Sequence, residues 1–360
     1  MYESFYELNA KPFQLSPDPR FFFNSRGHKR ALSYLRYGIR QGEGFIIITG
    51  DVGTGKTTLV TALFKALEKE DVVAAQVVTT NLQADDLLRF VASAFGLKSD
   101  RVSKASLLKN LETFFRACTQ EGKRVLLVVD EAQGLPKKSI EELRMLSNFQ
   151  INGRALLQTF ILGQREFRTT MRSEGFEQLR QRVIAAYHLK PLDAAETKGY
   201  ILYRLSTAGW KHNPTFDDEV FEIIHEFTGG VPRRINTLCD RMLLFGSIEG
   251  ITHFDGAAVR AVTRDIMEEQ GATTGELNKL DLELTNNEKP VGDKSQPTRR
   301  SNRAAKPSEV EETTTRTRLS ELETSFDSLA NAMREEMSLL RKALIEKDKP
   351  EKDKTDDDEH

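Results

Sequence analysis

A glycine-rich stretch at residues 50–57 constrains the fold more than any other part of the sequence. It reads Gly-Asp-Val-Gly-Thr-Gly-Lys-Thr, follows the apolar run Phe45–Ile48, and precedes a segment with helical spacing from Thr58 to Lys69. The pattern G-x-x-x-x-G-K-[ST] forms a phosphate-binding loop when a buried strand leads into it and a helix leads out. The sequence therefore predicts an α/β domain that binds a nucleoside triphosphate.

The residue types in this stretch suit the chemistry of phosphate binding. Glycines adopt positive φ angles and bring backbone N–H groups against phosphate oxygens, and the following helix adds its dipole. Lys56 can reach the β- and γ-phosphates, and the Thr57 hydroxyl can ligate Mg²⁺. The residues expected to hold the nucleotide are Gly50, Asp51, Val52, Gly53, Thr54, Gly55, Lys56, Thr57 and Thr58.

A second motif lies about 75 residues further along the chain. The run Val125–Val129 is wholly apolar and is followed by Asp130 and Glu131. An apolar run of this kind is typical of a strand buried on both faces of a parallel sheet. At its carboxyl end, Asp130 would complete the Mg²⁺ sphere with Thr57, and Glu131 would polarise the attacking water.

Further strands are expected at residues 72–79, 155–162 and 184–189, with helical segments between them. This alternation predicts a core with a parallel sheet, whose ligands bind at the carboxyl ends of the strands. Gln164 follows one of these strand ends. Its side chain would lie beside the γ-phosphate and the attacking water, or it is an ordinary residue at a strand exit.

Composition divides the remaining chain into an arm, two domains and a tail region. Residues 1–24 are rich in aromatic residues and prolines, and we expect an ordered, irregular arm over the nucleotide-binding domain of residues 25–192. Ser25 would cap a helix running to about residue 40, in which His28 either caps and packs or contacts the adenine pocket. Residues 193–270 show only helical patterns, which predicts a small α-helical domain.

The sequence beyond residue 270 changes in character. Residues 271–315 are polar and predict a disordered linker. Residues 316–347 carry apolar side chains at spacings of three and four, which favours a short coiled-coil-like helix that oligomerises or docks on a partner over a solvated amphipathic helix. Residues 348–360 form a charged tail.

The net charge, the two cysteines and the lengths of the apolar runs limit which partners we expect and where we expect the protein to be located. The 360 residues carry a formal charge of −2 and a pI near 6.4, so no overall positive field recruits DNA. Cys118 and Cys239 lie far apart in apolar helical patterns, which favours reduced core thiols over metal or redox chemistry. No leader sequence and no membrane-spanning apolar run occurs. We expect a cytoplasmic protein.

Several motifs together carry a resemblance to a known family. These are the opening Tyr2-x-x-Phe5-Tyr6-x-Leu8, the segment from Pro12 to Pro19, the phosphate loop, Asp130-Glu131-Ala132-Gln133, Leu146–Phe149 and Gly230–Asn236. Over residues 1–269 the sequence resembles AAA+ ATPases of the general secretion pathway protein A type, and especially secretion ATPases found with exosortase/PEP-CTERM exopolysaccharide loci.

The resemblance implies roles for individual residues. Residues 50–57 are similar to Walker A, and Asp130-Glu131 to Walker B. Gln164 falls at the sensor-1 position, where the family usually has Asn or Thr, and Arg233 falls at the sensor-2 position of a helical lid that faces the γ-phosphate. Arg182, or its neighbour Arg180, falls at the arginine finger, which would act across a subunit interface in a ring or filament.

The resemblance also implies a function. The sequence is interpreted as an ATPase that binds ATP and Mg²⁺ and acts as an oligomeric motor or switch for an exopolysaccharide-export or secretion assembly. Larger relatives continue into a transmembrane helix and a periplasmic peptidoglycan-binding region, which this sequence does not show, so recruitment to the inner-membrane face would go through protein partners. The alternatives are a DNA-associated regulator of the transposition type and a nucleotide-gated scaffold with little turnover.

Overall fold

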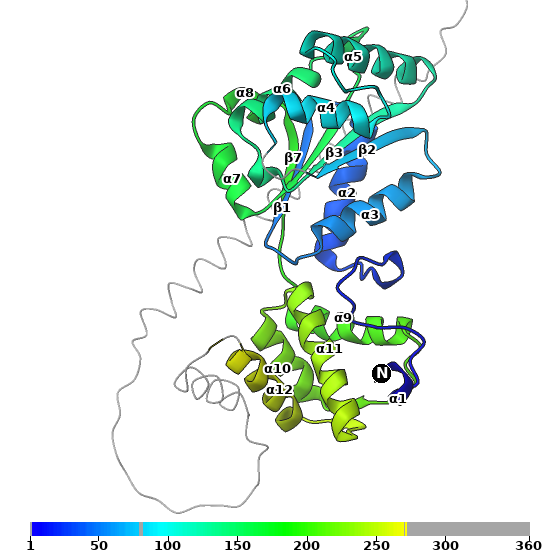
Figure 1. The fold of residues 1–360 in the computed structure, drawn as a ribbon, viewed down its shortest axis with the longest axis vertical. Coiled ribbons are helices and arrows are strands. Elements are labelled where there is room, and N and C mark those ends of the chain that lie inside the picture. The colour runs from blue at the N-terminus through cyan, green and yellow to red at the C-terminus, as the bar shows by residue number, and fades with distance from the viewer. Residues whose placement is uncertain (1, 79–81, 270, 272–360) are drawn as a thin grey trace, which may run out of the picture. The chain divides into compact units, whose positions relative to one another are not determined.

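The computed structural model describes residues 2–78, 82–269 and 271 (Figure 1). These residues form an α/β nucleotide-binding domain, a helical domain and an N-terminal arm. The predicted linker, C-terminal helix and charged tail lie outside the described residues, apart from Gly271. Among the described residues, no helix is both long and apolar enough to cross a membrane.

The nucleotide-binding domain is built on a five-stranded sheet in the order β2-β3-β6-β1-β7, and every pairing is parallel. This confirms the predicted parallel-sheet core. The strands are β1 (Phe45–Gly50), β2 (Val72–Val78), β3 (Arg124–Asp130), β6 (Gln158–Gly163) and β7 (Val183–Leu189). All residues of β1 and β6 are buried, as expected for central strands of a covered sheet.

Helices cover both faces of this sheet, and the alternation along β1 shows why (Figure 1). Ile46 and Ile48 belong to a cluster with two helices on one face, α2 (Arg26–Gln41) and α3 (Lys56–Leu67). Phe45 and Ile47 point the other way because successive strand residues face opposite sides. The helices whose residues join that second cluster are α4 (Ala84–Ala94), α5 (Lys104–Gln120), α6 (Lys137–Leu146), α7 (Arg165–Arg172) and α8 (Glu177–Arg180).

One strand differs from its predicted bounds by more than one residue. The strand expected from residue 155 begins at Gln158, because Arg154–Ala155 (β5) pair with Gln150–Ile151 (β4) in a separate hairpin. Its turn residues, Asn152 and Gly153, have φ of 51° and 75°. An Asn-Gly pair favours such a two-residue turn, so the hairpin has a local sequence signal that the prediction missed.

The helical domain contains the four expected helices, which are α9 (Ala194–Thr207), α10 (Asp218–Thr228), α11 (Pro232–Glu249) and α12 (Gly256–Glu269). The expectation of a wholly helical pattern was wrong in one respect. Thr215–Phe216 (β8) and His253–Phe254 (β9) form a short parallel pair. The rings of Phe216 and Phe254 stack at 5.6 Å, so aromatic packing fixes this pairing.

The described part of the N-terminal arm, residues 2–24, contains α1 (Tyr2–Phe5) and the 3-10 turn η1 (Pro19–Phe21). Its first half packs on the helical domain, so the expectation that the arm covers the nucleotide-binding domain is wrong for that half. In the second half, Phe22 does pack on the nucleotide-binding domain. The Tyr2 hydroxyl donates to Asp240 Oδ1 at 2.5 Å, and the Tyr6 hydroxyl donates to the Ile251 carbonyl at 2.9 Å. The arm then runs back to α2, whose N-cap is Ser25 as predicted.

Candidate nucleotide-binding site

The phosphate loop joins β1 to α3, as the sequence predicts. Two glycines in it adopt left-handed backbone conformations, Gly53 with φ of 83° and Gly55 with φ of 93°. A Cβ atom on Gly53 would lie 2.7 Å from the Cβ of Arg233, at the start of α11. The Arg233 N–H also donates to the Gly53 carbonyl at 3.2 Å. The loop therefore needs glycine both for its shape and for the close approach of the helical domain.

Lys56 is the first residue of α3 and is only 6% exposed. Its Nζ donates to the carbonyls of Gly50 at 2.7 Å and Asp51 at 3.1 Å. Burial lowers the pKa of Lys56, and the charges of Glu131, Asp130 and Asp51 oppose this shift. The ammonium group is thus held beside acidic residues, where a phosphate would compete for it.

Thr57 and Asp130, which the sequence predicts as Mg²⁺ ligands, lie within hydrogen-bond distance of each other. The Thr57 hydroxyl donates to Asp130 Oδ2 at 3.0 Å, and Asp130 Oδ1 accepts from the Glu131 N–H at 2.9 Å. Asp130 is 1% exposed, and this burial raises the pKa of its carboxyl. Hydroxyl and carboxylate oxygens are ligands that Mg²⁺ takes together with substrate phosphates, so the residues fit the ion that the sequence predicts.

The carboxylate of Glu131 is oriented by two glutamine side chains. Gln133 Nε2 donates to Glu131 Oε2 at 2.5 Å, and Gln164 Nε2 donates to the same oxygen at 3.3 Å. Gln133 Oε1 in turn accepts from the Gln164 N–H at 2.9 Å. Glu131 itself has φ of 57° and precedes the 3-10 turn η2 (Ala132–Gly134). Glu131 therefore combines a left-handed backbone conformation with a carboxylate that two glutamine side chains contact.

Gln133 is a site residue whose role the sequence did not reveal. It belongs to the Asp-Glu-Ala-Gln run, but only the fold brings it against Gln164, which follows a different strand. The sequence predicts Gln164 beside the γ-phosphate and the attacking water. In the structure its amide donates to Glu131 Oε2, and its contact with the phosphate stays a prediction.

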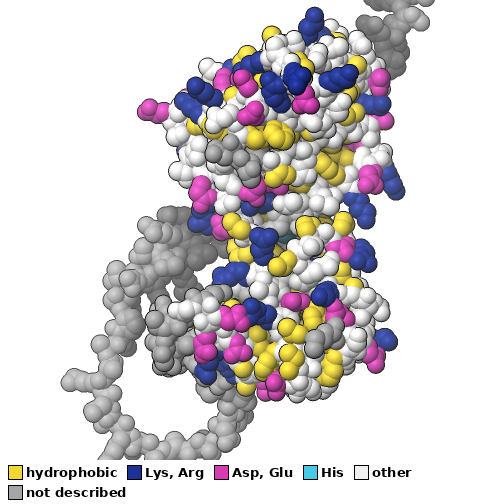
Figure 2. Space-filling view, viewed as in Figure 1, with side chains coloured by type: hydrophobic (Ala, Val, Ile, Leu, Met, Phe, Trp, Pro, Cys, Tyr) yellow, Lys and Arg dark blue, Asp and Glu magenta, His cyan; other side chains and the backbone are white. Residues whose placement is uncertain are grey.

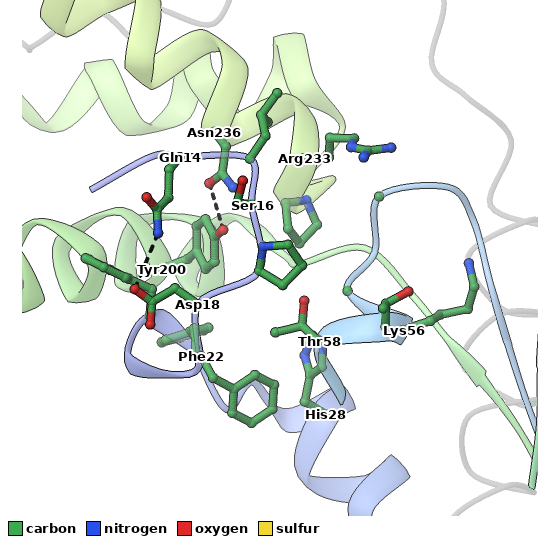
Figure 3. Close-up of a pocket in the computed structure, with 18 of the residues that line it drawn as sticks. Gln14, Ser16, Asp18, Phe22, His28, Lys56, Thr58, Tyr200, Arg233 and Asn236 are labelled. Atoms are coloured by element: carbon green, nitrogen blue, oxygen red, sulfur yellow. Dashed lines mark hydrogen bonds between the residues drawn. The ribbon is translucent and has the colours of Figure 1, made fainter. Parts of the chain in front are cut away.

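Behind the loop, the arm and the helical domain complete a pocket (Figure 3). Figure 3 shows Arg233 on the same side of the pocket as Lys56, with Tyr200 and arm residues on the other side. Tyr200 of α9 donates its hydroxyl hydrogen to Asn236 Oδ1 of α11 at 2.7 Å. The lining from the arm includes Gln14, Ser16, Asp18 and Phe22. This mixture of aromatic and amide groups suits a base and ribose.

The two arginine-finger candidates lie outside this pocket. Arg182 donates to the carbonyl of Ser147 at 3.1 Å and to its hydroxyl at 2.8 Å. Arg180 donates to the Met171 and Ser173 carbonyls at 2.9 and 3.0 Å. The fold therefore brings the predicted loop, Asp130, Glu131, Gln164 and Arg233 together in one chain, and leaves Arg180 and Arg182 apart from them.

Comparison with known proteins agrees with the geometry. Residues 39–171, which contain the phosphate loop, Asp130 and Glu131, match the AAA domain family. The chain is an AAA+ ATPase. This AAA+ ATPase is 37% identical over 259 residues to general secretion pathway protein A of Aeromonas hydrophila, a match that covers 71% of this chain and 47% of that protein. It thus spans about half the length of this curated relative.

Solved structures show the same fold for the AAA+ ATPase at low identity. The ORC2 protein of Aeropyrum pernix, solved with ADPNP and ADP, matches with a TM-score of 0.55 and 17% identity, over 79% of this chain and 86% of that one. Cdc6p of Pyrobaculum aerophilum matches with a TM-score of 0.55 and 12% identity, over 76% and 89% of the two chains. At identities this low, these similarities support the fold alone and say nothing about the partners or substrates of this chain.

Proposed function

We propose that this AAA+ ATPase is an oligomeric motor or switch that uses ATP hydrolysis to drive or regulate a bacterial secretion assembly for exopolysaccharide. One structural observation carries the catalytic half of the proposal. The Glu131 carboxylate is held by two amides at the end of β3, in the same pocket as Lys56 and Thr57. The similarity to a general secretion pathway protein supports the secretion half.

The proposed chemistry assigns a role to each part of the pocket. The phosphate loop and Lys56 hold the phosphates, and Thr57 with Asp130 would hold Mg²⁺. When bound, Mg²⁺ neutralises charge that develops on the phosphates. Glu131 accepts a proton from the attacking water, and its two amide partners fix the carboxylate for that task. Arg233, at the start of α11, senses the γ-phosphate from the helical domain.

The oligomeric half of the proposal concerns Arg182 and Arg180. Because both lie outside the pocket of their own chain, either can act on ATP only in a neighbouring copy. Both precede β7, which forms one edge of the sheet. An arginine supplied in this way stabilises the transferring phosphoryl group. We accordingly assign hydrolysis to a ring or filament of this chain, recruited through protein partners to the inner-membrane face.

The first experiment measures ATPase rate against protein concentration. The variants are Glu131→Gln, Arg182→Ala and Arg180→Ala, with Arg172→Ala on the exposed face of α7 as the matched control. Specific activity should rise with concentration in the wild type and the control. It should be lost in Glu131→Gln and in one of the two finger variants, with ATP binding retained. A specific activity independent of concentration, unchanged in both finger variants, would identify a monomeric switch instead.

Further outcomes separate the alternatives. No turnover at any concentration, with ATP still bound, would favour the nucleotide-gated scaffold. Salt-sensitive DNA binding that requires ATP would favour the DNA-associated regulator, whose case is weakened by the charge of −2. The export role is tested by deleting the gene in its host and measuring secreted polysaccharide, with complementation by the wild type and by Glu131→Gln. Secretion that continues unchanged after deletion would exclude this role.

A further inference from the structure

His28 is a buried histidine that connects the start of α2 to the back of the phosphate loop. It is 5% exposed, and Phe22 packs edge-on against its ring at 5.5 Å. The Ser25 hydroxyl lies 2.7 Å from His28 Nδ1. If the loop carried a Cβ atom at Gly55, that atom would lie 2.9 Å from His28 Nε2. The ring thus spans the space between the helix cap and the loop (Figure 3).

We assign the protons of this ring from its contacts, since the Ser25 hydroxyl can either donate to Nδ1 or accept from it. Ser25 Oγ accepts the His28 backbone N–H at 3.2 Å as the cap of α2, so the Ser25 hydroxyl hydrogen is available for Nδ1. Nε2 then carries the ring hydrogen. Burial lowers the pKa of His28 to about 4, so the ring is neutral at pH 7.

His28 Nε2 faces the loop at Gly55, and we assign the Thr54 carbonyl as its acceptor. A backbone hydrogen bond with Thr54 acts to raise the pKa of His28, which is the effect of a ring N–H that donates to a carbonyl. The Thr54 N–H is already donated to the Asp51 carbonyl at 3.3 Å. Ser25, His28 and the Thr54 carbonyl therefore form a relay of directed hydrogen bonds.

This relay fixes the orientation of one peptide group in the phosphate loop. In a planar trans peptide, the carbonyl oxygen and the next N–H point in opposite directions. When His28 holds the Thr54 carbonyl, the N–H of Gly55 must face away from the ring. Gly55 lines the nucleotide pocket, and the N–H groups of such a loop cradle the phosphates. An unrestrained peptide could rotate, since Gly55 tolerates many backbone conformations.

We propose that Ser25 and His28 are positioning residues that preset the Thr54–Gly55 peptide for phosphate binding, and that they therefore favour nucleotides carrying a β-phosphate over nucleoside monophosphates. This proposal rests on the assignment of the loop to nucleotide binding, and it is independent of oligomerisation or export. It differs from a direct contact between His28 and the base, because a base contact would serve ATP, ADP and AMP equally.

The test compares ADP and AMP affinities by displacement of a fluorescent ATP analogue from the full chain. His28→Ala should weaken ADP binding about tenfold, the scale expected for one hydrogen bond to a charged group, and leave AMP affinity within about twofold. His28→Gln keeps a side-chain N–H near the position of Nε2 and should restore most of the ADP affinity. Ser25→Ala should produce a smaller loss with the same preference for AMP.

Matched controls isolate the relay from general effects on folding. Ser103→Ala removes another serine N-cap, on α5, and His225→Ala removes another histidine bonded to a hydroxyl, that of Thr197. Neither control should change the ratio of ADP to AMP affinity. Equal losses for both nucleotides in His28→Ala, or an unchanged ADP affinity in His28→Ala and Ser25→Ala, would overturn the proposal. A wild-type chain that binds neither nucleotide would refute the site assignment itself.

Discussion

Arg204 of α9 connects the N-terminal arm to the helical domain, and its replacement should release the arm. The guanidinium donates to the carbonyls of Pro12 and Gln14 in the arm and to the Tyr200 hydroxyl. It also lies 5.1 Å from the centre of the Phe21 ring. The side chain is buried, so these contacts are poorly replaced by water. Arg204→Met keeps the apolar stem and removes the donors.

The expected magnitude follows from these contacts. A hydrogen bond from a charged donor contributes about 1.5–3 kcal/mol, which we assign to the Pro12 carbonyl. The Gln14 contact, at 3.4 Å, is too long to count in full. A cation over an aromatic ring adds about 0.5–2 kcal/mol, depending on burial. Arg204→Met should therefore destabilise the docked arm by about 3 kcal/mol, which raises the population of the detached arm roughly 100-fold.

Limited trypsin digestion measures this population directly. Arg20 is exposed within the arm, and cleavage after it requires the arm to open. When opening and closing are fast, the cleavage rate follows the open fraction. Release of the peptide 1–20, measured by mass spectrometry, should accelerate about 100-fold in Arg204→Met. Arg241→Met removes an exposed ion pair with Glu269 and should change the rate by no more than about fivefold. Equal rates in the two variants would refute the reasoning.

Three further predictions concern pH, the metal ligands and the loop. Because burial lowers the pKa of His28 to about 4 in the folded state, the unfolded state binds the extra proton between pH 6.5 and 4. Stability should therefore fall as pH falls through that window, by up to about 3 kcal/mol, and urea unfolding of His28→Gln should lack this part of the loss. Thr57→Ala should raise the Mg²⁺ concentration needed for half-maximal ATPase activity, whereas Thr113→Ala, which removes an exposed hydroxyl bonded within α5, should not; equal Mg²⁺ dependence would remove Thr57 from the metal site. Gly53→Ala should weaken ATP binding at least tenfold by calorimetry, because its Cβ would meet Arg233. The control Gly122→Ala changes a glycine with φ of 77° and open space around it, so that variant should lose stability only. Similar ATP affinities in the two variants would contradict the close approach.

The sequence predicted most accurately the strands whose residues are all or nearly all buried. Strands β1 and β3 appear as unbroken apolar runs because both faces of the sheet are covered, and the acids at the end of β3 therefore stand out. Thr57 and Asp130 could be paired in advance because strand ends in a parallel sheet meet at one edge. The positions of these side chains were thus predictable where a short motif fixes its own geometry.

The rest depends on contacts between distant parts of the chain. Tyr2 and Tyr6 find their partners 238 and 245 residues away, so nothing local indicates that the arm packs on the helical domain. Strands β8 and β9 have two residues each, too few to show a period. Gln133 contacts Gln164 only because η2 packs against β6, so its place in the site could not be predicted from the local sequence.

The docking of the arm changes how the helical domain can move. Since residues 2–13 pack on that domain, the chain enters the nucleotide-binding domain from it and later returns to it at residues 190–193. The helical domain is therefore connected to the nucleotide-binding domain at two points, which favours rotation about one axis over rotation in all directions. The motion we expect is a rotation about the line through both connections, which would carry Arg233 toward or away from the phosphate loop, where its N–H now donates to Gly53. A cut in the arm would leave one connection and free the remaining rotations.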